Sequence, residues 1–248
     1  MIVLLAFLGL LVGALVNQIA TDLMARRSLK PPRCPYCGEN RPRRQWLATL
    51  AFLLMRRRCP ACDVPIRWRY PLVEIGLAVT FAYLWIELGP SVKLVLYLIY
   101  AVIFTLVLIT DIERRLILNA VMYPAIALAI VAIPITPGLL WWNALAGGAI
   151  AFGFFWIAAL VGQLMFGSGA LGGGDVKLAT FIGLITGFPL VIEALVLAIC
   201  IGAVLSFLLL IFRIRGLRDH IPYGPFLVIG AAITLMWGYS IAHNFLNM

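Results

Sequence analysis

The chain has 248 residues, of which 64% are hydrophobic and only 12% are charged, and its formal net charge is +9. This composition excludes a soluble globular domain and is typical of a polytopic membrane protein. The basic residues lie in short segments between apolar runs, where they meet lipid headgroups, so we expect no nucleic-acid partner. The predicted fold class is an all-α polytopic membrane protein.

Apolar runs long enough to cross about 30 Å of hydrocarbon can be placed along most of the chain. We predict about eight transmembrane helices, and a Phe188-Pro189 break separates the short sixth helix from the seventh. The predicted spans are residues 2–22, 70–88, 92–110, 116–134, 140–162, 176–189, 190–212 and 223–245.

The basic residues also predict the orientation, because short loops rich in Lys and Arg stay on the cytoplasmic side. Twelve of the 19 basic residues lie between Arg26 and Arg69. With that loop inside, alternation across eight spans leaves only Lys93 outside and puts both termini outside. No basic residue precedes the first span, so we expect a retained anchor rather than a cleaved signal peptide.

A small polar lobe is inserted between the first two spans. We divide the chain into a first helix at 1–24, a cytoplasmic lobe at 25–69 and a seven-helix membrane domain at 70–248. The lobe contains an apolar segment, residues 45–55, that as a helix would extend only about 17 Å. Because this is too short to cross the bilayer, we expect the segment to lie in the membrane interface or to pack on the lobe.

Four of the five cysteines form two CxxC pairs in this lobe. Cys34 and Cys37 are separated by 21 residues from Cys59 and Cys62. Two such pairs are typical of a tetrahedral structural zinc site, and the alternatives are two disulfides or free thiols. A reducing cytosol disfavours disulfides, so we predict zinc with no catalytic role. Cys200 stands alone in the seventh span, where we expect a small buried side chain.

Two aspartates lie at predicted membrane boundaries. Asp111 ends the third span and Asp175 begins the sixth, and both are expected on the cytoplasmic side. A pair of carboxylates in which one is ionised and one is protonated is able to activate water and polarise a peptide carbonyl. The alternatives are a helix N-cap for Asp175, because it follows glycines and precedes an apolar run, and a solvated loop charge for Asp111.

Glycines surround Asp175. Residues 162–174 contain six glycines in 13 positions, which lets the backbone approach a neighbour closely. We assign Gly172, Gly174 and Lys177 to the loop of the candidate active site, with Lys177 as an interfacial anchor that favours ionisation of Asp175. A second group of glycines, Gly147, Gly148 and Gly153, is expected to let the fifth span pack closely against its neighbours.

Several motifs carry a family resemblance. The GxGD core ending at Asp175 resembles the signature of intramembrane aspartic proteases, and the two CxxC pairs have the spacing of one bacterial branch. Three further blocks resemble that branch: Arg69-Tyr70-Pro71-Leu72-Val73-Glu74, Leu108-Ile109-Thr110-Asp111 and Ile221-Pro222-Tyr223-Gly224-Pro225. The chain is identified as a member of the type IV prepilin peptidases, also called prepilin leader peptidase/N-methyltransferases.

The resemblance implies two activities in the bacterial inner membrane. Members cleave the short basic leader of type IV prepilins or type II secretion pseudopilins at the cytoplasmic boundary. They then methylate the new N-terminus with S-adenosylmethionine. By motif position, Asp111 and Asp175 become the catalytic pair and the four cysteines become the zinc ligands. The implied partners are these pilin substrates and membrane lipid.

Departures from the family pattern affect the methyltransferase. The first span reads Gly13-Ala14-Leu15-Val16-Asn17 where members have GSFLNV, and an apolar stretch replaces a polar N-I-P element between the cysteine pairs. Asn17 and Glu74 are the polar candidates for methylation, with a helix-packing or interfacial residue as an equal alternative for each.

Other interpretations stay open besides a bifunctional enzyme. One is a peptidase that has lost methylation, and another is a non-catalytic zinc-containing membrane scaffold. A transporter is disfavoured because its carboxylates would lie near the membrane midplane. The sequence does not predict the oligomeric state.

Overall fold

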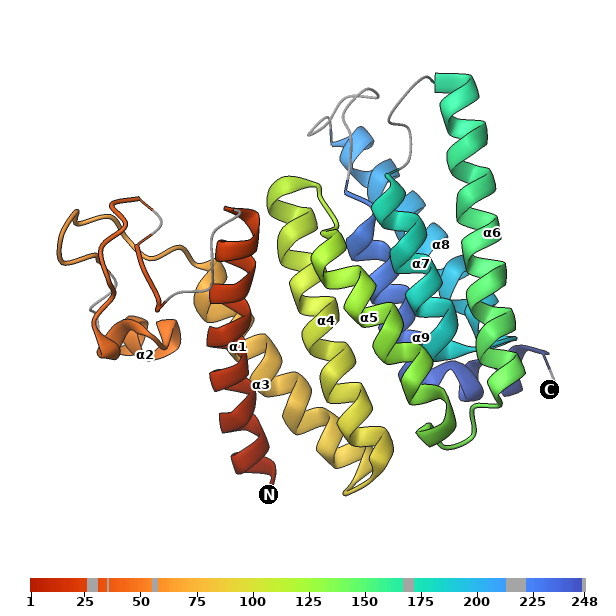
Figure 1. The fold of residues 1–248 in the computed structure, drawn as a ribbon, viewed down its shortest axis with the longest axis horizontal. Helices are drawn as coiled ribbons and strands as arrows, with labels where there is room; N and C mark the ends of the chain where they lie inside the picture. The colour runs from red at the N-terminus through yellow and green to blue at the C-terminus, as the bar shows by residue number, and fades with distance from the viewer. Residues whose placement is uncertain (26–30, 35, 55–57, 167–171, 213–221, 247–248) are drawn as a thin grey trace. The chain divides into compact units, whose positions relative to one another are not determined.

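The computed structural model describes residues 1–25, 31–34, 36–54, 58–166, 172–212 and 222–246 (Figure 1). The described chain is all-α, as predicted, and two isolated β-bridges are its only extended pairing. Eight of its α-helices occupy the eight predicted positions. They are α1 (Ile2–Met24), α3 (Arg69–Leu88), α4 (Val92–Arg114), α5 (Asn119–Ala132), α6 (Trp141–Phe166), α7 (Gly173–Thr186), α8 (Leu190–Ile211) and α9 (Gly224–Leu246).

Six of these helices are long and apolar enough to cross a membrane: α1, α3, α4, α6, α8 and α9. The other two, α5 and α7, have 14 residues each, which corresponds to about 21 Å of helix. A short 3-10 turn, η2 (Ile133–Ile135), extends α5. The count of eight complete spans therefore stays a prediction, whereas the break between α7 and α8 lies where Phe188 and Pro189 predicted it.

The chain divides into two compact units, Met1–Ile109 and Thr110–Met248. In the first unit, α1 and α3 pack at very short range. A Cβ at Gly13 would lie 2.6 Å from the Cα of Glu74, and a Cβ at Gly9 would lie 2.7 Å from the Cα of Ala78. Glycine is therefore required on this face of α1. The division of the chain into three segments, predicted from the sequence, stays a prediction.

The lobe of the first unit contains one short helix, α2 (Ala48–Leu53), preceded by the 3-10 turn η1 (Arg43–Gln45). Ala48, Ala51, Ile66 and Tyr70 form a small buried cluster, and Phe52 packs against it. The apolar segment thus packs on the lobe, which was one of the two expectations for it. Met55, its last residue, lies outside the described residues.

The second unit is built around α7, which packs against α6, α5, α8 and α9. Gly147 of α6 and Gly183 of α7 meet at the closest point, since a Cβ at Gly183 would overlap the Gly147 carbonyl. A Cβ at Gly148 would lie 2.8 Å from the Leu184 side chain, so close packing is confirmed at two of the three predicted α6 glycines, Gly147 and Gly148. For Gly153 the prediction was wrong, because no described atom lies within 4 Å of its Cβ position.

The prediction for Cys200 was also wrong. This residue is exposed on the outer surface of α8 rather than buried. The neighbouring Ile199 and Val204 are likewise exposed. A side chain on this face of an apolar helix that crosses the membrane meets lipid, and a thiol is apolar enough to do so.

Candidate functional site

The two CxxC pairs form two turns with the same hydrogen bonds. In the first, the Cys34 amide donates to the Glu39 carbonyl and the Gly38 amide donates to the Cys34 carbonyl, both at 2.9 Å. In the second, the amides of Cys59 and Asp63 make the equivalent bonds at 3.0 and 2.9 Å. The fifth residue of each turn has a positive φ, +76° at Gly38 and +56° at Asp63. Each turn directs its two thiols to the same side.

The four thiols are arranged as ligands of one ion. The Sγ atoms of Cys34 and Cys62 are 3.6 Å apart and those of Cys37 and Cys59 are 3.7 Å apart. All four lie within 4.8 Å of one another and none is in a disulfide. Tetrahedral zinc with bonds of about 2.3 Å requires sulfur atoms about 3.8 Å apart, so the donor set fits zinc. Hydrogen bonds from the amides of Cys62 and Ala61 lower the pKa of Cys59 to about 6, which favours the thiolate.

Asp111 lies in the last turn of α4 and is buried. Its Oδ2 accepts a hydrogen bond of 2.9 Å from the backbone amide of Gly224, the first residue of α9. A Cβ at Gly224 would lie 2.6 Å from this same oxygen. The solvated loop charge considered for Asp111 is thus wrong, because the carboxylate is covered by the start of another helix.

Asp175 is the third residue of α7 and is partly buried. Its Oδ2 accepts a hydrogen bond of 3.3 Å from the backbone amide of Gly172, which is the N-cap position. The helix-capping role considered for Asp175 is therefore present, although from the third helical position rather than the N-cap. One carboxylate oxygen makes this contact, so capping leaves the other oxygen available for chemistry.

The two aspartates belong to one electrostatic cluster in the second unit. The charge of Asp111 acts on Asp175, and the charge of Asp175 acts on Tyr223, the residue before α9. The cluster therefore combines the C-terminal end of α4 with the N-terminal ends of α7 and α9. Two carboxylates in such a setting resist simultaneous ionisation, which suits general acid and base roles.

The glycines before Asp175 have different roles. A Cβ at Gly174 would lie 2.7 Å from the Cβ of Ile117, so glycine lets α7 approach the segment that follows α4. A Cβ at Gly173 would meet no described atom within 4 Å. The backbone amide of Gly172 donates the hydrogen bond that Asp175 accepts. The loop residues 167–171 lie outside the described residues.

Lys177 points to a neighbour other than Asp175. Its Nζ donates to the Asn119 Oδ1 at 2.6 Å and lies 4.7 Å from the centre of the Tyr123 ring. Both partners belong to α5. Lys177 therefore ties α7 to α5, and the structure gives no sign of the expected effect on Asp175.

The two methylation candidates lie in the first unit. Asn17 of α1 is buried, and its Nδ2 donates to the Tyr70 carbonyl at 2.9 Å, while its Oδ1 has no hydrogen-bond partner among the described residues. Glu74 of α3 is buried with both oxygens engaged. Its Oε1 accepts the Ala48 amide at 2.8 Å, and its Oε2 accepts the Thr49 amide and hydroxyl at 2.7 Å.

Sequence reasoning missed the roles of Gly224 and Asn119. Gly224 stands in a motif that the sequence revealed, but only the folded chain shows its amide against Asp111. Asn119 follows an apolar run with no distinguishing pattern. No signal in the sequence could have paired it with Lys177, which is 58 residues away.

Two family models match the chain, one on each part. The "Bacterial Peptidase A24 N-terminal domain" matches residues 7–88, and the "Type IV leader peptidase family" matches residues 97–207. Together they include both aspartates and all four cysteines of the CxxC pairs. The chain belongs to the type IV leader peptidase family. As a member of this family, it is a peptidase.

Curated relatives in this leader peptidase family resemble the chain over most of its length. The prepilin leader peptidase/N-methyltransferase of Bacillus subtilis (strain 168) is 26% identical over 250 residues, covering 100% of this chain and 99% of the relative. The protein of that name from Aeromonas hydrophila is 28% identical over 243 residues, covering 94% and 79%. The one from Pseudomonas putida is 27% identical over 219 residues, covering 86% and 74%. No solved structure matches the chain.

Proposed function

We propose that this leader peptidase is a membrane aspartic endopeptidase that removes the basic leader of type IV prepilins or type II secretion pseudopilins. The observation that carries the proposal is the pair Asp111 and Asp175, at the C-terminal end of α4 and the N-terminal end of α7, each hydrogen-bonded to a backbone amide at a helix start and close enough for one charge to act on the other. The names of the curated relatives, prepilin leader peptidase/N-methyltransferases, supply the substrate class.

The chemistry needs no covalent intermediate. One carboxylate is ionised and takes a proton from water, while the other is protonated and donates a hydrogen bond to the scissile carbonyl. Asp111 suits the ionised role, because its carboxylate accepts a 2.9 Å hydrogen bond from an amide at the positive end of α9. Asp175 suits the role of proton donor, because its hydrogen bond to the amide of its own helix N-cap is longer than that of Asp111.

The substrate would meet the enzyme at the cytoplasmic face of the bacterial inner membrane. The positive-inside rule supports this orientation for the lobe and for both aspartates. A prepilin changes from a basic leader to an apolar helix at its cleavage site. Catalytic groups at helix ends, rather than at the membrane midplane, match that position in the substrate.

Methylation of the new N-terminus is the second proposed activity. S-adenosylmethionine would supply the methyl group when bound. Of the two candidates, Asn17 is better suited to a ligand, because its Oδ1 is a buried acceptor without a partner in the described part of the chain. Both oxygens of Glu74 are occupied by α2, which favours a positioning role for this residue.

Cleavage of a purified prepilin by the full-length enzyme, followed by mass measurement of the product, tests both activities. We expect leader removal by the wild type and none by Asp111→Asn or Asp175→Asn, with both variants accumulating in the membrane. Glu113→Gln, a nearby carboxylate change, is the matched control and should cleave. Complete cleavage by either Asp variant would reject the catalytic pair, whereas no cleavage by the wild type would favour the scaffold interpretation.

The mass of the processed N-terminus separates the two enzymatic alternatives. With S-adenosylmethionine added, an increase of one methyl group indicates the bifunctional enzyme. A correctly cleaved but unmethylated product indicates a peptidase that has lost its second activity.

Zinc in the lobe is tested by metal analysis of the purified chain. We expect about one zinc ion per chain, lost in Cys34→Ser because a four-thiolate site does not hold the ion tightly with three thiolates. Cys200→Ser removes a thiol that is exposed on α8 and should keep the ion. A Cys34→Ser chain with a full complement of zinc would refute the site.

A further inference from the structure

The short helix α2 is apolar on both of its sides. Ala48 and Ala51 are buried against the lobe. On the other side Leu50, Leu53 and Leu54 are 41%, 76% and 52% exposed. They recur at the i, i+3 and i+4 spacing of one helix face. A helix that is hydrophobic all round belongs inside an apolar medium, and the described lobe covers only half of this one.

Hydrogen bonds to Glu74 fix the position of α2 along the axis of α3. The amides of Ala48 and Thr49, which begin α2, donate to the carboxylate of Glu74 at 2.8 and 2.7 Å. Glu74 lies five residues after Arg69, the first residue of α3, which is about 7.5 Å along the helix axis. The start of α2 therefore lies beside the membrane-spanning helix rather than beyond its end. Figure 1 shows α2 at the edge of the lobe, and α2 packs against α3.

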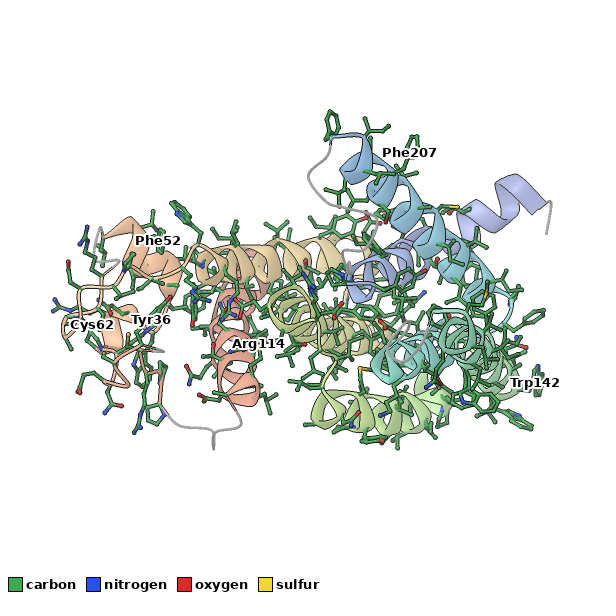
Figure 2. The ribbon with its side chains drawn as sticks, turned by 90° about the horizontal axis from the view of Figure 1, so that it is seen from above. Tyr36, Phe52, Cys62, Arg114, Trp142 and Phe207 are labelled. Carbon is green, nitrogen blue, oxygen red and sulfur yellow. The ribbon has the colours of Figure 1, made fainter. Side chains whose placement is uncertain are left out.

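Exposed apolar side chains of α3 lie next to α2. The ring of Phe52 lies 4.7 Å from that of Trp68, which precedes α3 and is 65% exposed. Leu72, four residues further on, shares a face with Trp68 and is 66% exposed, and Ile75 follows at 46%. Figure 2 labels Phe52 on α2, apart from Tyr36 and Cys62 in the loops of the lobe.

We propose that α2 is an interfacial helix whose outer leucines insert into the phospholipid bilayer beside α3 and so anchor the zinc lobe to the membrane surface. The occupant is lipid because this surface lies next to exposed apolar side chains of a membrane-spanning helix. Trp46 and Trp68 add exposed indoles of the kind enriched at the membrane interface. Arg44 is exposed before α2 and is placed to contact lipid phosphate.

This anchor also explains the burial of Glu74. A carboxylate at this depth would be costly unless its oxygens were satisfied, and α2 supplies three donors to it. The inference is independent of the proposed peptidase activity, because it concerns how the lobe is held.

Photo-crosslinking of the full-length protein in phospholipid vesicles tests the proposal. A benzoylphenylalanine in place of Leu53 should give phospholipid adducts by intact mass at ten times or more the yield of the same probe in place of Glu39. Glu39 is also exposed and lies in the first cysteine turn. Zinc content of both proteins checks that the lobe has folded.

Other occupants of the exposed face of α2 would give different crosslinked products, and each of these would overturn the proposal. A crosslinked dimer without lipid would show that a second copy covers α2, and an adduct with added prepilin that replaces the lipid adduct would show a substrate surface. Equal lipid yields at Leu53 and Glu39, or no lipid adduct at Leu53, would mean that α2 faces water.

Discussion

At the scale of single residues, both aspartates are held by the same device, a backbone amide at the start of a helix. Gly224 supplies it to Asp111 from another helix, and Gly172 supplies it to Asp175 from the same helix. An amide at a helix N-terminus stabilises a carboxylate and fixes its orientation without adding a charge of its own. The pair is therefore oriented by backbone, which explains why glycines surround it.

Substitution of Gly224 by alanine should reduce cleavage while the fold persists. The added Cβ would lie 2.6 Å from the Asp111 Oδ2, so the carboxylate must move. A displacement of about 1 Å at a catalytic group costs about 100-fold in rate. The turnover number for prepilin cleavage measures this, and Gly153→Ala, whose Cβ enters open space, should leave it unchanged. Wild-type turnover in Gly224→Ala would contradict the positioning role.

The sequence could identify the two aspartates, the four cysteines and the glycine run, because each has a recognisable residue type at a recognisable spacing. It could not predict which atoms those side chains meet. The partner of Asp111 is 113 residues away and offers a backbone amide, which every residue except proline has. The pairing of Lys177 with Asn119, rather than an influence on Asp175, was missed for the same reason.

At the scale of elements, close helix contacts shape both units. The α1–α3 pair and the α6–α7 pair each depend on glycines that bring backbones together. In a membrane, where lipid removes the hydrophobic drive for association, such close packing is a principal source of helix affinity. The α6–α7 contact matters for the site, because α7 carries Asp175 at its start.

Substitution of Gly183 by alanine should destabilise the second unit. The new methyl group would overlap the Gly147 carbonyl and force α6 and α7 apart. Overpacking of this kind costs about 1–3 kcal/mol of folding free energy. Thermal or denaturant unfolding in detergent measures the loss, with Gly153→Ala on α6 as the neutral control. Equal stability of the two variants would mean that the helices separate at no cost.

Element positions were predictable from apolar runs, whereas the length of α5 and the ends of α7 were not. The apolar sequence continues past the end of each helix, but the helical conformation of the backbone does not. Leu118 is extended before α5, and Gly187, with φ of +71°, ends α7. Individual glycine contacts were also unequal, since Gly147 and Gly148 pack tightly and Gly153 does not. Composition alone does not reveal which face of a helix meets a neighbour.

At the scale of the whole molecule, charge and hydropathy together describe a chain that crosses the membrane several times. The predicted orientation rests on the basic residues, of which the inserted lobe holds twelve of 19. The shortest helices in the predicted spans are α5 and α7, and about 21 Å of helix falls short of about 30 Å of hydrocarbon. Neighbouring helices and a locally thinner bilayer would compensate for this difference.

Fusions to alkaline phosphatase, which is active only outside the cytoplasm, test the orientation. We expect activity for fusions ending at Gly89 and Gly138 and none for a fusion ending at Arg115, because four crossings precede Gly138. An inactive fusion at Gly138 would mean that α5 does not cross. An active fusion at Arg115 would reverse the predicted orientation of both aspartates.

The most direct test of the catalytic pair compares cleavage rates of Asp111→Asn, Asp175→Asn and the double variant on one purified prepilin. Two residues that act as one unit are non-additive, so each single variant should fall to the background rate and the double variant should be no slower than either. Substantial cleavage by one single variant, or partial losses that multiply in the double variant, would show that the two carboxylates do not work as a pair.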